Sequence, residues 1–168
     1  MSRKLDTEEI IRISTDEFKQ AKKIPLVVVL DNVRSMHNIG SVFRTSDAYV
    51  VEKVVLCGIT AQPPHPDIHK SALGAEFSVD WEYYPSAKES VRALQEQGFK
   101  VYAVEQAEGS TMLQNLAIDS NVKYAIVMGN EVKGVNQEVV DMCDGCIEIP
   151  QFGTKHSLNV SVTAGMVI

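Results

Sequence analysis

A series of short, strongly apolar segments places the tightest limits on how this chain folds. The first, Pro25-Leu26-Val27-Val28-Val29-Leu30, is an unbroken run with polar ends, a pattern typical of a β-strand buried on both faces. Four further apolar runs predict strands at 53–57, 99–104, 124–128 and 146–149. Helical stretches alternate with these runs, at 39–48, 86–97 and 136–143. The alternation indicates the α/β class, with a mostly parallel sheet covered by helices on both faces.

The length of 168 residues fits a single domain, and no repeat, low-complexity tract or linker divides the chain. Ahead of the first strand, Thr7 to Lys23 predicts one short amphipathic helix, with Asp6-x-x-Glu9 as its capping box. Its apolar anchors would be Ile10, Ile11, Ile13 and Phe18. The lysines at its end (Lys19, Lys22 and Lys23) have two interpretations, as complements of the helix dipole or as an RNA-facing group.

Composition narrows the location and the class of partner. No apolar run is long enough to span a membrane, and no apolar stretch follows the charges of the N-terminus, so a secretory signal is not expected. Three cysteines, an odd number, without an export signal point to the reducing cytoplasm. The formal charge of −6 argues against bulk attraction of nucleic acid, although it leaves room for a local basic patch.

Several common ligand motifs are missing. Gly129 and Gly134 have the spacing of a P-loop, but Val135-Asn136 follows where lysine and serine or threonine are required, and no G-x-G-x-x-G occurs. Cys143-x-x-Cys146 stands alone, so structural zinc would need two more ligands, with Cys57 and His65 or His69 as the loose candidates. Ordinary thiols are the better interpretation, and no metal is expected.

Polar residues follow the ends of several predicted strands. Because the carboxyl ends of parallel strands meet at one edge, we expect these loops to converge there on a ligand. The residues are Asn38 and Arg44, then Glu105 and Gln106, then Gly129 to Gly134, and finally Pro150, Gly153, Lys155 and Ser157. We expect Asn38 to cap one helix and the last helix to begin at or near Ser157. Taken alone, that last segment also fits a terminal helix that docks on the core.

Three ordered motifs in these loops carry a resemblance. They are Asn38-x-Gly40-x-x-x-Arg44, Gly129-Asn130-Glu131-x-x-Gly134, and Ile149-Pro150-x-x-Gly153-x-x-x-Ser157-Leu158-Asn159-Val160-Ser161-Val162. Together they resemble the SpoU/TrmH family of S-adenosylmethionine-dependent RNA ribose 2′-O-methyltransferases, within the SPOUT superfamily. The segment from Pro64 to Glu76 is also similar to a loop common in this family. The resemblance implies a C-terminal trefoil knot, at about 124–168, and a homodimer. It also implies a tRNA or rRNA substrate, with guanosine favoured.

The resemblance assigns roles to individual residues. The catalytic set would be Asn38, Arg44, Glu131, Ser157 and Asn159, with Glu131 paired to Arg44. S-adenosylmethionine would be bound by Gly129, Ile149, Leu158, Glu105 and Pro150, largely through the backbone. RNA would contact the basic residues of these loops, Arg34, Arg44, Lys70, Lys133 and Lys155. The guanidinium of Arg44 could bind a phosphate and stabilise the negative charge that develops on an alkoxide. Its service as proton acceptor is a hypothesis, because a guanidinium has a pKa above about 12.

Two other classes of protein remain open. A non-catalytic RNA-binding paralogue would keep the fold and lose the site, which the presence of Asn38, Arg44, Glu131 and Asn159 disfavours. An α/β enzyme with an acidic small-molecule site would suit the charge but leaves the three motifs unexplained. The sequence ends at Ile168, within the last predicted helix, and the amphipathic continuation that usually packs the dimer is missing.

Overall fold

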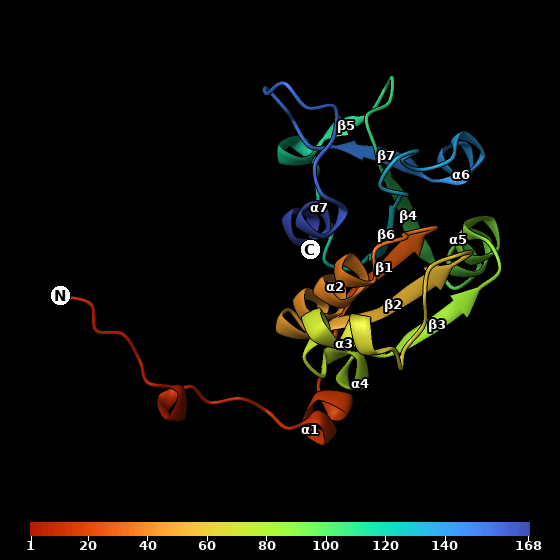
Figure 1. Cartoon of the computed structure of the whole chain (residues 1–168). Helices are drawn as coiled ribbons and strands as arrows, with labels where there is room; N and C mark the ends of the chain where they lie inside the picture. The colour runs from red at the N-terminus through yellow and green to blue at the C-terminus, as the bar shows by residue number, and fades with distance from the viewer.

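The computed structural model describes residues 1–168 and contains one seven-stranded sheet (Figure 1). The strand order is β3-β2-β1-β6-β4-β7-β5, and every neighbouring pair is parallel. The strands are β1 (Ile24–Asp31), β2 (Val51–Cys57), β3 (Trp81–Tyr84), β4 (Phe99–Val104), β5 (Thr111–Met112), β6 (Lys123–Met128) and β7 (Gly145–Glu148). The prediction of a mostly parallel α/β sheet is confirmed. The two edge strands, β3 and β5, were not predicted, because neither contains a buried apolar run.

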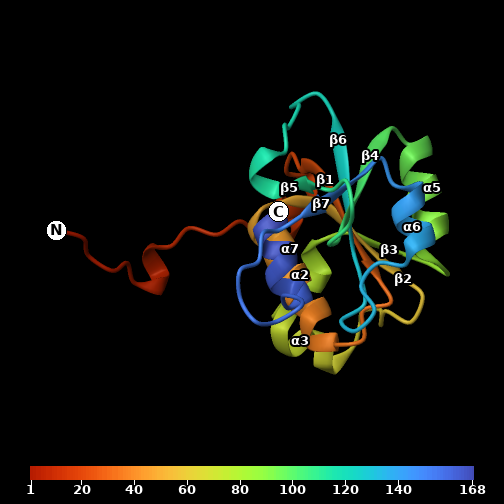
Figure 2. The same cartoon turned by 90° about the horizontal axis from the view of Figure 1, so that it is seen from above.

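Helices cover both faces of the sheet, each over its own apolar core (Figure 2). On one face lie α2 (Met36–Ala48), α3 (Pro66–Ala72), α4 (Ala75–Ser78) and α7 (Val160–Val167). On the other lie α5 (Ala87–Glu96) and α6 (Gln137–Met142). β1 contributes to both cores, since Val28 and Leu30 face α2 while Val27 and Val29 face the opposite way. This alternation is the physical reason for its unbroken apolar sequence. No helix is long and apolar enough to cross a membrane.

Helices α2 and α3 pack closely at Gly40. A Cβ atom there would lie 2.1 Å from the Ser71 hydroxyl and 2.3 Å from the Ile68 carbonyl oxygen, so only glycine allows this approach. Ser71 in turn donates a hydrogen bond to the His37 carbonyl at 2.8 Å. The contact fixes the position of α2, which carries Asn38 and Arg44.

The predicted helix from Thr7 to Lys23 is wrong. The segment holds a 3₁₀ turn, η1 (Thr7–Glu9), and a short helix, α1 (Thr15–Gln20), and it extends away from the body up to α1 (Figure 1). The Asp6 amide does bond the Glu9 carboxylate at 2.8 Å, as in a capping box, but the turn ends at Glu9, and the predicted anchor Ile11 is 91% exposed. A second capping box, Ser14 with Glu17, starts α1 afresh.

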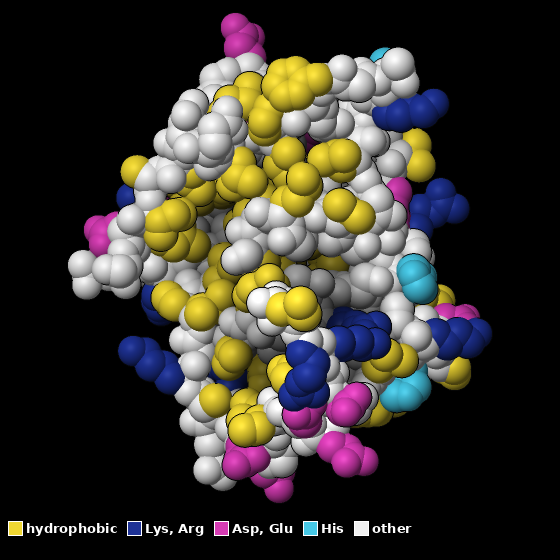
Figure 3. Space-filling view, turned by 90° about the vertical axis from the view of Figure 1, so that its left-hand side faces the viewer, with side chains coloured by type: hydrophobic (Ala, Val, Ile, Leu, Met, Phe, Trp, Pro, Cys, Tyr) yellow, Lys and Arg dark blue, Asp and Glu magenta, His cyan; other side chains and the backbone are white.

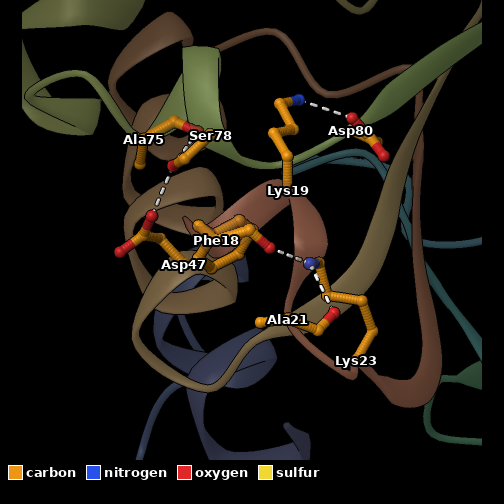
Figure 4. Close-up of polar contacts among 8 residues, drawn as sticks. All are labelled: Phe18, Lys19, Ala21, Lys23, Asp47, Ala75, Ser78 and Asp80. Carbon is orange, nitrogen blue, oxygen red and sulfur yellow. Dashed lines mark hydrogen bonds and ion pairs between the residues drawn. The ribbon is translucent and has the colours of Figure 1, made fainter. Parts of the chain in front are cut away.

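Helix α1 is anchored to the body by Phe18 and two lysines (Figure 4). The Phe18 side chain is buried, and the Lys23 ammonium lies 4.4 Å from its ring centroid and bonds the Phe18 and Ala21 carbonyls. Lys19 pairs with Asp80 at 2.5 Å. Lys19 and Lys23 therefore have partners within the protein, which favours the structural interpretation of these lysines over the RNA-facing one.

Candidate active site

A cavity of about 350 Å³ opens at the carboxyl ends of β4, β6 and β7, within the size range of small-molecule sites. Its walls come from three segments that are distant in sequence. The lining residues are Val104, Glu105, Gln106, Met128, Gly129, Asn130, Glu131, Val132, Lys133, Gly134, Val135, Ile149, Gln151, His156, Ser157, Leu158, Val160 and Thr163. The loops predicted to converge after β4, β6 and β7 therefore do so. Pro150 is not among the residues that line the cavity.

Glu131 joins the cavity to the start of α2. Its carboxylate accepts hydrogen bonds from the backbone amides of Arg34 and Ser35, at 3.0 and 2.9 Å, and from the Asn38 side chain at 3.2 Å. Burial opposes ionisation of this carboxyl, but these hydrogen bonds outweigh it and hold its pKa below the ordinary value. The predicted Glu131–Arg44 ion pair is wrong, because Glu131 binds amides of the α2 N-terminus instead.

Asn38 connects this network to the last helix. The Asn159 side-chain amide donates to Asn38 Oδ1 at 3.1 Å, while Asn159 Oδ1 accepts from the Ser161 and Val162 amides and so caps α7. The expected Asn38 cap is wrong, because the cap of α2 is Ser35, which leaves the Asn38 side chain free for Glu131. Helix α7 begins at Val160, near Ser157 as expected, and its cap is Asn159. Ser157 instead lies exposed at the cavity.

Glu105 holds the opposite wall together. Its carboxylate accepts from the Gln106 amide at 2.7 Å and from the Val135 amide at 3.0 Å. The loop it contacts is tight, because a Cβ at Gly129 would lie 2.2 Å from the Gly134 carbonyl carbon. Asn130 stabilises the same turn by accepting from the Val132 and Lys133 amides and donating to the Asn32 carbonyl. Asn130 lies within the predicted Gly129 to Gly134 loop, although no role was assigned to it, and His156 lies in the predicted loop before the last helix.

Arg44 does not lie at this cavity. It is exposed on α2 and lines a separate hollow formed by α1, α2, α3 and the segment before α1. A straight helix turns by about 100° per residue, so Arg44, six positions after Asn38, points about 120° away from it. The expectation that Arg44 meets the cavity loops is therefore wrong within one chain. The sequence spacing did not reveal this because the prediction treated Asn38 as a residue before the helix.

The other predicted RNA contacts lie at several places. Lys133 lines the cavity, Lys155 is exposed on the loop before α7, and the Arg34 side chain is exposed beside the α2 N-terminus. Lys70 is exposed on α3, where it pairs with Asp67 at 2.6 Å. All four side chains are exposed, and they lie on four different segments of the chain.

The cysteines offer no metal site. All three thiols are free, and no group of three or more His, Cys, Asp or Glu side chains gathers in the structure. Burial raises the pKa of Cys57 and of Cys143 to about 12 each, so both are protonated thiols at neutral pH.

The chain matches known proteins over most of its length. The sequence model of the SpoU rRNA Methylase family matches residues 25–168. The chain belongs to the SpoU rRNA methylase family.

Two curated relatives of this SpoU chain illustrate the match. It is 32% identical over 153 residues to the 23S rRNA (guanosine-2′-O-)-methyltransferase RlmB of Neisseria meningitidis, covering 91% of this chain and 60% of that protein. It is 31% identical over 160 residues to the tRNA (guanosine(18)-2′-O)-methyltransferase of Thermus thermophilus, covering 95% and 80%. The SpoU chain thus spans about 60% of the first relative and more of the second.

Solved SpoU-type structures share the fold. An AdoMet-bound rRNA methyltransferase from Sinorhizobium meliloti superimposes with a TM-score of 0.80 at 26% identity, covering 89% of this chain and 57% of that one. The TrmH/SpoU tRNA modifying enzyme of A. aeolicus gives a TM-score of 0.78 at 26% identity, covering 91% and 78%. The first of these structures contains AdoMet, which is S-adenosylmethionine.

Proposed function

We propose that this protein transfers a methyl group from S-adenosylmethionine to a ribose 2′-hydroxyl of tRNA or rRNA, with guanosine the favoured nucleotide. The family membership and the printed activities of the Thermus and Neisseria relatives support the class of reaction. The observation that carries the proposal is the hydrogen-bond network of Glu131, Asn38 and Asn159, which joins all three motifs at the edge of one cavity.

The cavity fits S-adenosylmethionine in size and in lining. Gly129, Ile149 and Leu158 line it, together with the apolar residues Val104, Met128 and Val160. The bound cofactor supplies an activated methyl group, and this chain's residues supply orientation. A held geometry of this kind contributes several kcal/mol to catalysis. The Asn38 and Asn159 amides are fixed by Glu131 and by each other, so they suit the positioning of a ribose.

We also propose a homodimer in which the Arg44 of one copy serves the cofactor cavity of the other. Arg44 is separated from the cavity of its own chain, and neither an ion pair nor a side-chain hydrogen bond holds it. Exposed apolar side chains support the association: Phe152, Val162 and Met166 are 95%, 54% and 53% exposed. Figure 3 shows hydrophobic side chains gathered on the left-hand side of Figure 1, the side on which α7 lies. There Arg44 would orient an RNA phosphate and stabilise the developing alkoxide.

The remaining expectations belong to the same proposal. RNA would be held at Arg34, Lys70, Lys133 and Lys155 through salt-sensitive phosphate contacts. Residues 1–168 would form one domain that works in the cytoplasm, with the trefoil knot at about 124–168. The insertion of β7 between β4 and β5, and the contact of α7 with α2, support the knot by bringing the C-terminal segment beside earlier elements.

Methyl transfer to RNA tests the proposed activity. Purified protein, total tRNA, total rRNA and S-adenosylmethionine with a labelled methyl group should give labelled RNA, and nuclease digestion should place the label on a ribose 2′-oxygen. Replacing Arg44 with alanine should lower the rate at least about a hundredfold, in keeping with the loss of a group that acts on developing charge, while cofactor binding persists. Unchanged transfer by Arg44→Ala would remove this residue from the mechanism.

A non-catalytic RNA-binding paralogue is the second candidate. It would bind RNA and retain the fold and the cavity, but it would transfer no label to any fraction of tRNA or rRNA. This candidate would be favoured if calorimetry shows that the wild-type protein binds S-adenosylmethionine while the transfer assay detects no labelled RNA.

A further inference from the structure

The segment that closes one side of the cavity has few hydrogen bonds to the rest of the protein, although its first residue, Ile149, is buried. Between the end of β7 and the Asn159 cap of α7, residues 149–158 make a single hydrogen bond to any other segment. In it, the Gln106 side-chain amide donates to the His156 carbonyl oxygen at 2.6 Å. Five residues of this segment nevertheless line the cavity: Ile149, Gln151, His156, Ser157 and Leu158.

Gln106 itself is held by the opposite wall. Its backbone amide donates to the Glu105 carboxylate at 2.7 Å, and that carboxylate also accepts from the Val135 amide in the loop after β6. The backbone on either side is fixed as well, because the Glu105 amide bonds the Ile147 carbonyl and the Cys146 thiol bonds the Glu105 carbonyl. Gln106 thus extends from a fixed wall to a loosely attached one.

We propose that Gln106 is a positioning residue that latches the 149–158 segment over the cofactor cavity. The inference rests on the proposed function of that cavity as the S-adenosylmethionine site. With the latch formed, the backbone at Ile149 and Leu158 is already placed for the cofactor, so binding requires less ordering of the segment. Without it, the segment must be ordered at the moment of binding, and affinity falls.

Two substitutions separate a latch from a simple charge effect. Gln106→Glu keeps the shape but replaces the donor with a carboxylate facing a carbonyl oxygen, whereas Gln106→Lys keeps a donor. S-adenosylmethionine carries a positive sulfonium, so an effect of charge alone would make the glutamate variant bind more tightly and the lysine variant less tightly. A latch predicts the reverse order. Gln97→Glu is the matched control, since Gln97 is exposed at the amino end of β4 and its side chain makes no hydrogen bond.

Calorimetric titration with S-adenosylmethionine gives the first readout. One net hydrogen bond is worth about three- to tenfold in affinity, so Gln106→Glu should raise the Kd by about that factor. Gln106→Lys and Gln97→Glu should stay within about twofold of wild type, and the kcat of Gln106→Glu at saturating cofactor should fall less than its kcat/KM. An unchanged Kd in Gln106→Glu, or the order expected from charge, would overturn the proposal.

Limited trypsin digestion gives a second readout that does not depend on the cofactor. Lys155 is exposed in the segment and lies next to His156, so the fragment ending at Lys155 reports how often the segment opens. Gln106→Glu should release this fragment several times faster than wild type and Gln97→Glu. If wild type fails to bind S-adenosylmethionine, the proposed function fails, yet faster cleavage in Gln106→Glu still identifies the latch. Equal cleavage rates in wild type and all variants would contradict the proposed role of Gln106.

Discussion

Glu131 satisfies three donors that would otherwise lack partners at the start of α2. A carboxylate from a loop 96 residues away accepts from the amide of Ser35, the N-cap of α2, and from the amide of Arg34 just before it, and its negative charge suits the N-terminus of a helix. Its further bond to Asn38 sets the orientation of a side chain that in turn contacts Asn159. A glutamate in this position therefore determines the shape of the site without having to react.

Replacing Glu131 with glutamine should destabilise the protein in a pH-dependent way. Glutamine offers one neutral acceptor, so we expect a loss of about 1–2 kcal/mol in the free energy of unfolding at pH 7. The folded pKa of Glu131 lies below its ordinary value of 4.5, so its contribution is present above that value and is lost as the pH falls through the folded pKa.

Urea denaturation at pH 7 and at pH 3 measures the Glu131 effect. The difference between wild type and Glu131→Gln should shrink strongly at the lower pH, with Glu108→Gln as the control, because Glu108 is exposed and accepts no hydrogen bond from the protein. A difference that stays constant with pH would mean that the carboxylate charge does not stabilise the α2 N-terminus.

At the scale of elements, the position of α2 depends on its close contact with α3. Gly40→Ala places a methyl group against the Ser71 hydroxyl and the Ile68 backbone oxygen, at 2.1 and 2.3 Å, so α2 must move. We expect a loss of about 1–3 kcal/mol, or more, in the free energy of unfolding. Gly165→Ala in α7 is the matched control, because its added Cβ would meet only the Thr45 methyl at 3.9 Å. That variant should be neutral or more stable by about 0.5–1 kcal/mol.

Thermal or urea unfolding of the two alanine variants measures the difference. Gly40→Ala should also weaken S-adenosylmethionine-dependent transfer, because Asn38 shares the displaced helix. Equal stability of the two variants would show that α3 can move away from α2 with little loss of free energy. The contact at Gly40 would then not determine the position of α2.

The sequence was informative where one local pattern decides the outcome. The unbroken apolar runs predicted β1, β2, β4, β6 and β7, because a strand buried on both faces requires such a run. The helix predicted at 86–97 is α5, which runs from Ala87 to Glu96 after its Ser86 cap. The sequence failed where several residues compete for one role. Ser35 and Asn38 are both good caps three positions apart, and only the carboxylate of Glu131 decides between them.

In the site, too, the sequence predicted some features and missed others. The three motifs predicted which loops converge, because the carboxyl ends of neighbouring parallel strands must lie together. They did not predict where Arg44 points, since that depends on the phase of α2, nor the Gln106–His156 contact, since it joins two irregular segments. The N-terminal segment was also predicted wrongly, because apolar spacing implies a helix only if the apolar side chains find a surface to cover.

At the scale of the whole molecule, the separation of Arg44 from the cavity of its own chain makes a prediction about mixed dimers. Arg44→Ala removes the guanidinium, and Leu158→Arg places a long cation at a residue that lines the cavity, so each variant alone should be inactive. If each site takes Arg44 from the other copy, a mixed dimer contains one intact site, formed by the cavity of the first variant and the Arg44 of the second. In a two-fold dimer, random mixing should restore about a quarter of wild-type methyl transfer.

The alternative arrangement gives the opposite result, which makes the experiment decisive. If Arg44 serves the cavity of its own chain, every chain in the mixture has lost one of the two groups, and no mixing ratio restores activity. The two variants should be co-expressed with different affinity tags, and the mixed dimer should be isolated through both tags in sequence. Its transfer rate is then compared with those of the two parental dimers.

Failure to recover any mixed dimer, with monomers found by ultracentrifugation instead, would contradict the proposed homodimer itself. The apolar face carrying Phe152, Val162 and Met166 would then need another partner.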